Sequence, residues 1–121
     1  LIKINLIRTN MGLIIGYRGE TLDSLQYLVN LAVNKGNEGQ YKKITLDTEN
    51  YRAKREETLK RLAGKMAYKV RKSNKAVKLE PMNPYERRII HSALQNESSI
   101  VTYSEGEEPH RRVVIDLKKK A

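Results

Sequence analysis

The chain contains no Cys, no Trp and no Phe, and its only aromatic residues are seven Tyr. The absence of Cys excludes disulfides and thiolate metal sites, and it fits a protein of the reducing cytoplasm. No hydrophobic run approaches the length of a membrane span and no signal peptide is visible, so we expect no direct insertion into a membrane. The chain begins at Leu1 rather than Met, which indicates a piece of a longer protein.

A length of 121 residues suits one ordinary domain or two small ones. The net charge of +10 is unevenly spread, because residues 1–50 carry six Lys and Arg against five Asp and Glu, whereas residues 51–121 carry eighteen against nine. A basic half of this kind is typical of a domain that binds nucleic acid or another polyanion. A solvated basic surface that only keeps the protein soluble is the alternative.

The first half of the chain predicts a small α+β domain. Apolar and polar residues alternate over 1–7 and 42–48, which predicts two strands, the first of them half-buried. A short apolar turn of helix is expected over 11–16, and apolar residues at helical spacing predict a longer helix over 20–35. We place the boundary of this domain near residue 50.

The second half predicts another α+β domain, with a three-stranded sheet and two helices. The expected elements are a long helix over 51–72, a strand over 76–80, a helix from Pro84 to about Gln95 and a hairpin over 99–117. Asn83 as N-cap and Pro84 in the first turn mark the start of the second helix. On the long helix Arg61, Lys65 and Lys69 are each four residues apart and predict a basic stripe.

The stretch Gly16-Tyr17-Arg18-Gly19 connects the two helices that we expect in the first domain. Glycines without a Cβ let a phosphate backbone come close, and the N–H groups of the following helix point toward it. Arg18 can pair with a phosphate, and Tyr17 offers a ring. A tight turn between helices that needs glycine and binds nothing is the alternative.

Arg87 and His91 are four residues apart and share one face of the helix that follows Pro84. They lie just past the edge of an apolar arc, so their polar ends are expected to meet solvent or a phosphate. The arc is formed by Tyr85, Ile89, Ile90, Ala93 and Leu94. A histidine that serves only packing at the edge of a helix is the alternative for His91.

The glycine loop, with a helix on each side and a strand before and after, resembles the later portion of a type II KH domain. In that family the loop clamps about four nucleotides of single-stranded RNA or DNA. The resemblance implies that the leading helix and strand of the family lie upstream, or that the edge strand here is open to a partner. Glu20 departs from the pattern, because an acid directly after the loop repels a phosphate.

The segments LEPMNPYERRIIHSALQ and VTYSEGEEPHRRVVI resemble the Arg-x-x-x-His (R-3-H) domain of single-stranded nucleic-acid binders. Together with GETLDSLQYLVNLAVNK and LDTENYR, they make essentially the whole chain similar to the bacterial Jag (SpoIIIJ-associated, KhpB-like) family. The resemblance implies a KH domain over 1–50, in its C-terminal portion, and an R-3-H domain over 51–121. It also implies a cytoplasmic RNA-binding regulator of cell elongation, division and shape, often paired with a small KH protein.

These observations predict a non-catalytic binding protein with no metal and no cofactor. The expected nucleic-acid-binding residues are Gly16, Tyr17, Arg18, Gly19, Arg87, Arg88, His91 and Arg111, and the supporting basic surface is Arg61, Lys65 and Lys69. The expected partner is single-stranded RNA, with single-stranded DNA as a second ligand and a homodimer or a heterodimer with a small KH protein as the assembly.

Two other functions stay open. The first is a scaffold that dimerises through an open sheet edge. The second is a nuclease with His91 as general base. The sequence disfavours the nuclease, because it has only two histidines, no carboxylate cluster for a metal and no Walker-type loop.

Overall fold

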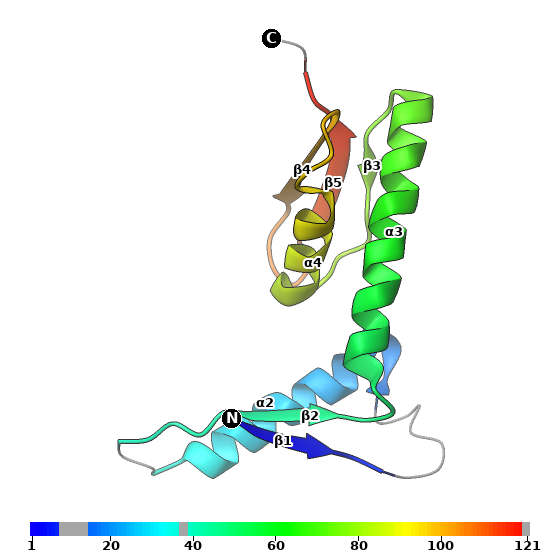
Figure 1. Ribbon diagram of the computed structural model, residues 1–121. Coiled ribbons are helices and arrows are strands. Elements are labelled where there is room, and N and C mark those ends of the chain that lie inside the picture. Colours follow the sequence, from blue (N-terminus) through cyan, green and yellow to red (C-terminus); the bar gives the residue numbers. More distant parts are fainter. Residues whose placement is uncertain (8–14, 37–38, 120–121) are drawn as a thin grey trace. The chain divides into compact units, whose positions relative to one another are not determined.

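The computed structural model describes residues 1–7, 15–36 and 39–119, and it divides into two compact units, residues 1–55 and 56–121 (Figure 1). Each unit has its own sheet and its own hydrophobic core. The division falls inside the helix α3 (Tyr51–Ser73), whose first residues pack with unit 1. The predicted α+β class is confirmed.

Unit 1 is a two-stranded parallel sheet with one helix packed on it. β1 (Ile2–Asn5) pairs with β2 (Ile44–Asp47), and Ile2 stands opposite Ile44. α2 (Glu20–Asn34) follows the short 3₁₀ turn η1 (Tyr17–Gly19) and places Leu22 against β2. The helical turn predicted over 11–16 falls mostly outside the described residues.

The burial of β1 differs from the prediction. The strand forms where the alternation indicates, but Ile2 and Ile4 are 43% and 37% exposed, so neither face of β1 is buried among the described residues. The reason is that the apolar face of α2 packs on β2 and gives β1 no comparable cover. This packing buries Ile44 and Leu46 of β2 almost completely. The segment that follows β1 directly contributes Leu6 to this core.

Unit 2 is a three-stranded antiparallel sheet packed against two helices, as predicted. The strands lie in the order β3 (Val77–Lys78), β5 (Arg112–Leu117) and β4 (Ile100–Glu105), and the helices are α3 and α4 (Pro84–Leu94). α4 begins as the sequence indicates, because the Asn83 side chain accepts a hydrogen bond of 2.8 Å from the Glu86 N–H. The core of the unit is formed by Leu59, Ala63, Ala67, Val70, Leu79, Met82, Ile89, Ile90, Leu94, Ile100, Val113 and Ile115.

The buried face of α4 is rotated relative to the predicted apolar arc. Tyr85 is 60% exposed and Ala93 is exposed as well, whereas Arg87 is only 8% exposed. Arg87 can be buried because the folded chain supplies acceptors for its guanidinium.

None of the helices in the described ranges is long and apolar enough to cross a membrane.

Candidate nucleic-acid interface

The loop of residues 16–19 is held in an unusual backbone conformation. Gly16 and Gly19 have φ values of +70° and +74°, in the left-handed region that glycine adopts at little cost. A Cβ at Gly16 would lie 2.3 Å from Thr21 Oγ1, and one at Gly19 would lie 2.5 Å from Tyr51 Cε1. The local geometry therefore requires glycine at both positions, and this holds with or without a ligand.

Arg18 is the residue of this loop that the conformation alone does not explain. Its φ is +53°, although it carries a side chain, and a non-glycine residue in the left-handed region costs about 1–2 kcal/mol. Such strain is concentrated at functional sites. Gly19 also caps α2 without a side-chain hydrogen bond, and the first N–H groups of a helix favour anions. The exposed Glu20 acts against this preference.

Further along α2, one edge of β2 is closed by side chains of this helix rather than by another strand. Asn30 Nδ2 donates to the Ile44 carbonyl at 2.7 Å, and Asn30 Oδ1 accepts from the Ile44 N–H at 2.8 Å. Asn34 repeats this pair of bonds with Lys42 one helical turn later. The opposite edge of β2 pairs with β1.

The row of side-chain bonds to β2 continues toward the start of α3. Gln26 Oε1 accepts from the Leu46 N–H at 2.9 Å, and Arg52 Nε donates to the Leu46 carbonyl at 2.7 Å. Arg52 also forms an ion pair of 2.7 Å with Asp23. We refer to Gln26, Asn30 and Asn34 as the amide ladder. It fixes α2 on β2 and so holds the residues that follow the glycine loop.

In unit 2, Arg87 is buried and both arms of its guanidinium are occupied. Nη1 donates to the Met82 carbonyl at 2.6 Å, and Nη2 forms an ion pair of 2.6 Å with Glu108 Oε1. The Glu108 side chain is 50% exposed. Arg87 thus ties the segment before α4 to the turn between β4 and β5.

His91 lies between two hydroxyl groups of β4. Its Nδ1 is 2.7 Å from Thr102 Oγ1, and its Nε2 is 2.9 Å from Ser104 Oγ. A hydroxyl both donates and accepts, so the pair satisfies either neutral tautomer of the ring. Burial lowers the pKa of His91, and the nearby charges of Arg87 and then Arg111 lower it further. The neutral imidazole is therefore the form of this residue at neutral pH.

Arg111 completes the cluster around His91. Its Nη1 donates to the Gly106 carbonyl at 2.6 Å, and its Nη2 donates to the Ser104 carbonyl at 3.3 Å. Three of the residues predicted from the sequence, Arg87, His91 and Arg111, are therefore brought together beside the turn between β4 and β5. We refer to these three residues as the α4 cluster.

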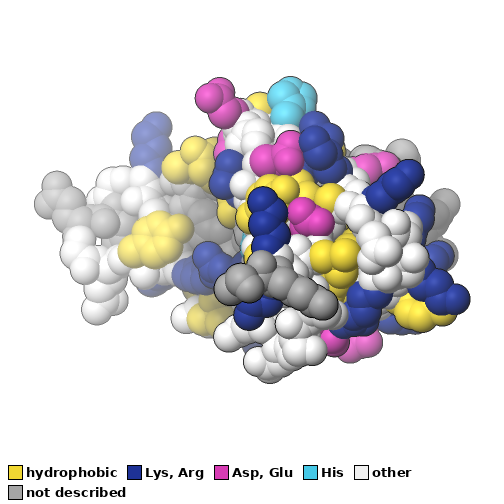
Figure 2. All heavy atoms as spheres, turned by 90° about the horizontal axis from the view of Figure 1, so that it is seen from above, with side chains coloured by type: hydrophobic (Ala, Val, Ile, Leu, Met, Phe, Trp, Pro, Cys, Tyr) yellow, Lys and Arg dark blue, Asp and Glu magenta, His cyan; other side chains and the backbone are white. Residues whose placement is uncertain are grey.

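The other predicted basic residues lie elsewhere on unit 2. Arg88 is exposed and lines a hollow of about 300 Å³ between α3 and α4, together with Lys60 and Tyr85. Arg61, Lys65 and Lys69 are exposed along α3, as the predicted stripe requires. Figure 2 shows Lys and Arg side chains spread over the visible face with Asp and Glu among them, not gathered in a single patch.

Sequence reasoning missed the partners of the α4 cluster. Thr102 and Ser104 are two residues apart on one strand, so they share a face, and this spacing was the available signal. Glu108 had no such signal, because it lies in a turn. Nothing in the parts of the chain that the structure describes groups three His, Cys, Asp or Glu residues in a way that could hold a metal ion.

Comparison with known families matches this architecture. The R-3-H domain model matches residues 57–117, and the model described as KhpA/KhpB, KH domain matches residues 1–45. The chain therefore belongs to the R-3-H domain family, with a KH-type module ahead of the R-3-H domain. The resemblance inferred from the sequence is confirmed.

Several curated proteins named RNA-binding protein KhpB are similar to the chain. The protein from Clostridium symbiosum is 59% identical over 117 residues, which cover 97% of this chain and 52% of the relative. The protein from Bacillus subtilis (strain 168) is 45% identical over 120 residues, which cover 98% of this chain and 57% of the relative. The chain thus spans about half the length of these two curated relatives.

Proposed function

We propose that this chain binds single-stranded RNA and has no catalytic activity. The observation that carries the proposal is the conformation of residues 16–19, where two left-handed glycines and a strained Arg18 precede a helix N-terminus without a side-chain cap. The matches to KH and R-3-H modules support it, as does the name RNA-binding protein of the relatives. Single-stranded DNA is a second ligand of the same chemistry.

In the proposed complex, the sugar-phosphate backbone of the RNA lies against Gly16 and Gly19 of unit 1, where no Cβ keeps it away. Its phosphate accepts from the first N–H groups of α2, and Arg18 neutralises part of its charge. We also include Tyr17, the residue before Arg18, among the residues of this loop that bind the RNA. The amide ladder serves this arrangement indirectly, because it holds α2 in place on β2.

In unit 2 the exposed cations supply attraction to the phosphates. The exposed residues are Arg61, Lys65, Lys69 and Arg88, and Arg111 lies half-buried beside His91. A phosphate reaches the guanidinium of Arg87 by displacing Glu108, whose carboxylate occupies one arm and is half exposed. His91 contributes as a neutral hydrogen-bonding residue that positions β4, not as a charge.

A role of His91 as general base is not favoured by this geometry. Such a base needs an acceptor nitrogen within hydrogen-bond reach of the substrate proton. Both nitrogens of His91 are already bonded to Thr102 and Ser104. We therefore propose binding without turnover.

We also propose, from the resemblance, that the protein acts in the cytoplasm as a regulator of cell elongation, division and shape. The same resemblance proposes a small KH protein, or a second copy of the chain, as a protein partner. In this proposal the KH domain extends over residues 1–50 and the R-3-H domain over 51–121. The compact units divide near residue 55 because Tyr51 and Arg52 pack with unit 1.

The loop is tested with Arg18→Asp, measured by titration of a fluorescent oligoribonucleotide. Asp tolerates the left-handed conformation, so the variant places a negative charge at the phosphate without new backbone strain. We expect a loss of affinity of roughly tenfold or more. Arg18→Asn is the matched control, because it removes the positive charge only and should lose less. Wild-type affinity in Arg18→Asp would reject the loop as the clamp.

The basic surface is tested by the salt dependence of the same titration. Replacing Arg61, Lys65 and Lys69 by Gln should weaken binding and reduce the slope of log K against log salt by up to about 2, because each contact to a single strand contributes about 0.7. An unchanged slope would leave these residues outside the interface. If the unmodified protein bound no oligonucleotide at low salt, the proposed function itself would be wrong.

A further inference from the structure

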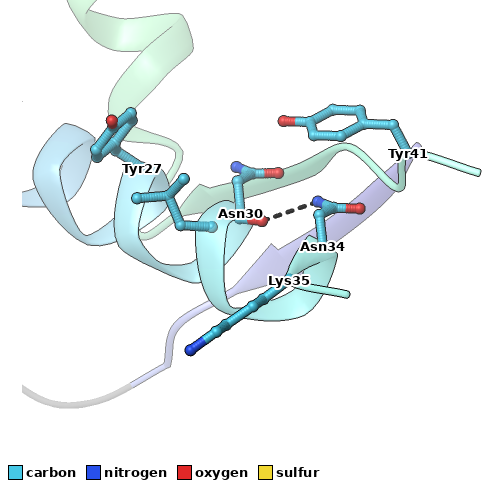
Figure 3. Close-up of a pocket in the computed structure, with 6 residues that line it drawn as sticks. Tyr27, Asn30, Asn34, Lys35 and Tyr41 are labelled. Carbon is cyan, nitrogen blue, oxygen red and sulfur yellow. Dashed lines mark hydrogen bonds between the residues drawn. The ribbon is translucent and has the colours of Figure 1, made fainter. Parts of the chain in front are cut away.

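Unit 1 has a shallow hollow on the side of α2 that faces the segment before β2 (Figure 3). Its volume is about 370 Å³. The lining residues are Tyr27, Asn30, Leu31, Asn34, Lys35 and Tyr41. None of these residues belongs to the glycine loop, so the hollow is a separate feature of the same unit.

The two tyrosines at the hollow are largely uncovered. Tyr27 is 66% exposed and Tyr41 is 71% exposed, and Leu31 next to them is 53% exposed. In Figure 3 the ring of Tyr27 lies toward one end of the hollow and that of Tyr41 toward the other, with Asn30 between them. Rings at both ends of an apolar floor offer flat surfaces to a flat ligand.

The floor of the hollow is rigid because the amide ladder passes beneath it. Asn34 binds both backbone groups of Lys42, the residue that follows Tyr41, at 2.8 Å and 2.7 Å. Asn34 Nδ2 also donates to the Asn30 carbonyl at 2.8 Å, the bond drawn in Figure 3. The backbone that carries Tyr41 is therefore tied to the helix that carries Tyr27, and the hollow is preformed.

The charge around the hollow favours an anionic occupant. Its lining contains no acidic residue and one Lys, and Lys42 and Lys43 follow Tyr41 directly. The ammonium of Lys35 points away from the rings in Figure 3, so it contributes charge at the rim and not a contact at the floor. Flat apolar surfaces surrounded by positive charge fit a nucleobase with its phosphates, because bases stack on aromatic rings while lysines neutralise the backbone.

The hollow also lies where a strand held at the glycine loop would pass. Leu31 is eleven residues after Glu20, which places the two within about 20° of each other around the helix axis. The distance from Gly19 to Leu31 along that axis is about 18 Å, at 1.5 Å per residue. A strand clamped by its backbone at the loop therefore reaches the hollow a few nucleotides further on.

We propose that Tyr27 and Tyr41 form a stacking site for unpaired nucleobases, which extends the path of single-stranded RNA from the glycine loop along α2. This inference rests on the proposed function and adds a contact to bases, where the loop contacts backbone. Asn34 Oδ1 accepts one bond from Lys42 and keeps a second lone pair, with which it can accept from an N–H group of a base.

The test compares two ligands, a short oligouridine and a strand of the same length without bases. Replacing both Tyr27 and Tyr41 by Leu keeps apolar bulk at each position and removes the ring. We expect the double variant to bind oligouridine roughly tenfold more weakly or worse, since stacking on each ring is a sizeable part of single-strand affinity. Its affinity for the strand without bases and its salt dependence should stay as in the unmodified protein.

Two control variants make the result specific. Tyr27→Phe with Tyr41→Phe keeps the rings and should retain oligouridine binding. Tyr68→Leu removes another exposed tyrosine, on α3 and 59% exposed, and should have no effect. Both substituted positions of the test variant are exposed, so the fold should survive, and its melting curve checks this.

Two results would overturn the inference. One is oligouridine binding by the Leu variant as tight as that of the unmodified protein. The other is an equal loss of affinity for oligouridine and for the strand without bases, which would show that the two rings do not act on the bases. Either result would leave the proposed function intact, because that function is tested separately by Arg18→Asp.

Discussion

Arg87 and Arg88 are adjacent and chemically identical, yet the structure gives them opposite environments. Successive residues of a helix differ by 100° in direction, so one side chain turns toward the sheet and the other toward solvent. Arg87 meets the Met82 carbonyl and the Glu108 carboxylate, which satisfy its charge and make burial possible. Arg88 remains exposed and available for long-range attraction. A mutation of Arg88 consequently tests charge alone, whereas a mutation of Arg87 also removes its bonds to Met82 and Glu108 and so affects the fold as well.

His91 leads to a prediction about pH. Its pKa in the folded protein is lowered by burial and by Arg87 and Arg111, whereas in the unfolded chain it is near 6.5. Between those two values the unfolded chain binds more protons, so stability falls as the pH decreases. The contribution of His91 to the free energy of unfolding is fully present above about pH 6.5, and it is lost as the pH falls through the lowered pKa of the folded protein.

Urea denaturation of the wild type and of His91→Gln over the pH range from about 7.5 to 5.5 measures this effect. We expect the free energy of unfolding of the wild type to decrease more steeply toward low pH than that of the variant. His110→Gln removes the other histidine and serves as the reference. Parallel curves for the wild type and His91→Gln would contradict the prediction.

At the scale of elements, α2 is attached to β2 by a row of side-chain amides as well as by the apolar core of unit 1. Gln26, Asn30 and Asn34 recur every fourth residue and so form one stripe along the helix. They bond to the backbone of alternate residues of the chain leading into and through β2. The stripe thereby does for this edge of β2 what a neighbouring strand would do, and it protects the edge from pairing with another chain.

Asn30→Ala should accordingly be the most damaging change in the ladder. It removes three hydrogen bonds, one to the Gln26 carbonyl and two to Ile44, and leaves the N–H and C=O of the buried Ile44 without these partners. The expected loss in free energy of unfolding is about 2 kcal/mol or more. Asn34→Ala, at the exposed end of the ladder, is the matched control and should cost about 1 kcal/mol or less. Both losses are measured by urea denaturation. Equal losses in the two variants would show that the contribution of each amide to stability does not depend on how deeply its hydrogen bonds are buried.

At the scale of the whole molecule, the two units have very different cores. Among the described residues, the cluster of unit 2 contains twelve buried apolar side chains and that of unit 1 contains three, Leu22, Ile44 and Leu46. Because stability increases with buried apolar area, unit 1 should open more readily than unit 2. We therefore expect the unit that we propose to clamp RNA to be the less stable of the two.

Hydrogen exchange provides the measurement. We expect the backbone amides of β5 to exchange more slowly than those of β2, because the amides of β5 become accessible only when the larger core of unit 2 unfolds. Leu22→Ala should accelerate exchange in β2 and leave β5 unchanged. Acceleration of both strands by this substitution would mean that the units open as one, against the division into two cores.

Much of the fold could be predicted from the sequence because its elements follow from local patterns. The helix predicted over 51–72 is Tyr51–Ser73 in the structure, and the hairpin predicted over 99–117 is formed by β4 and β5. The candidate site was predicted less completely. The spacing of Arg87 and His91 and the glycine loop could be recognised. The spacing of Thr102 and Ser104 indicated a shared face but not that His91 lies against it, and Glu108 and the proposed pair of Tyr27 and Tyr41 gave no local signal. Thr102, Ser104 and Glu108 are each distant in sequence from the residue that they contact.

The sequence by itself determined the periodicity of the helices and strands, the positions of the glycines and the excess of positive charge, because these depend on neighbouring residues and on composition. Only the tertiary structure decided that Arg87 is buried, that His91 is neutral between two hydroxyls, and that amides of α2 close an edge of β2. Burial and pKa depend on which distant groups the folded chain brings within a few ångströms. No local pattern contains that information.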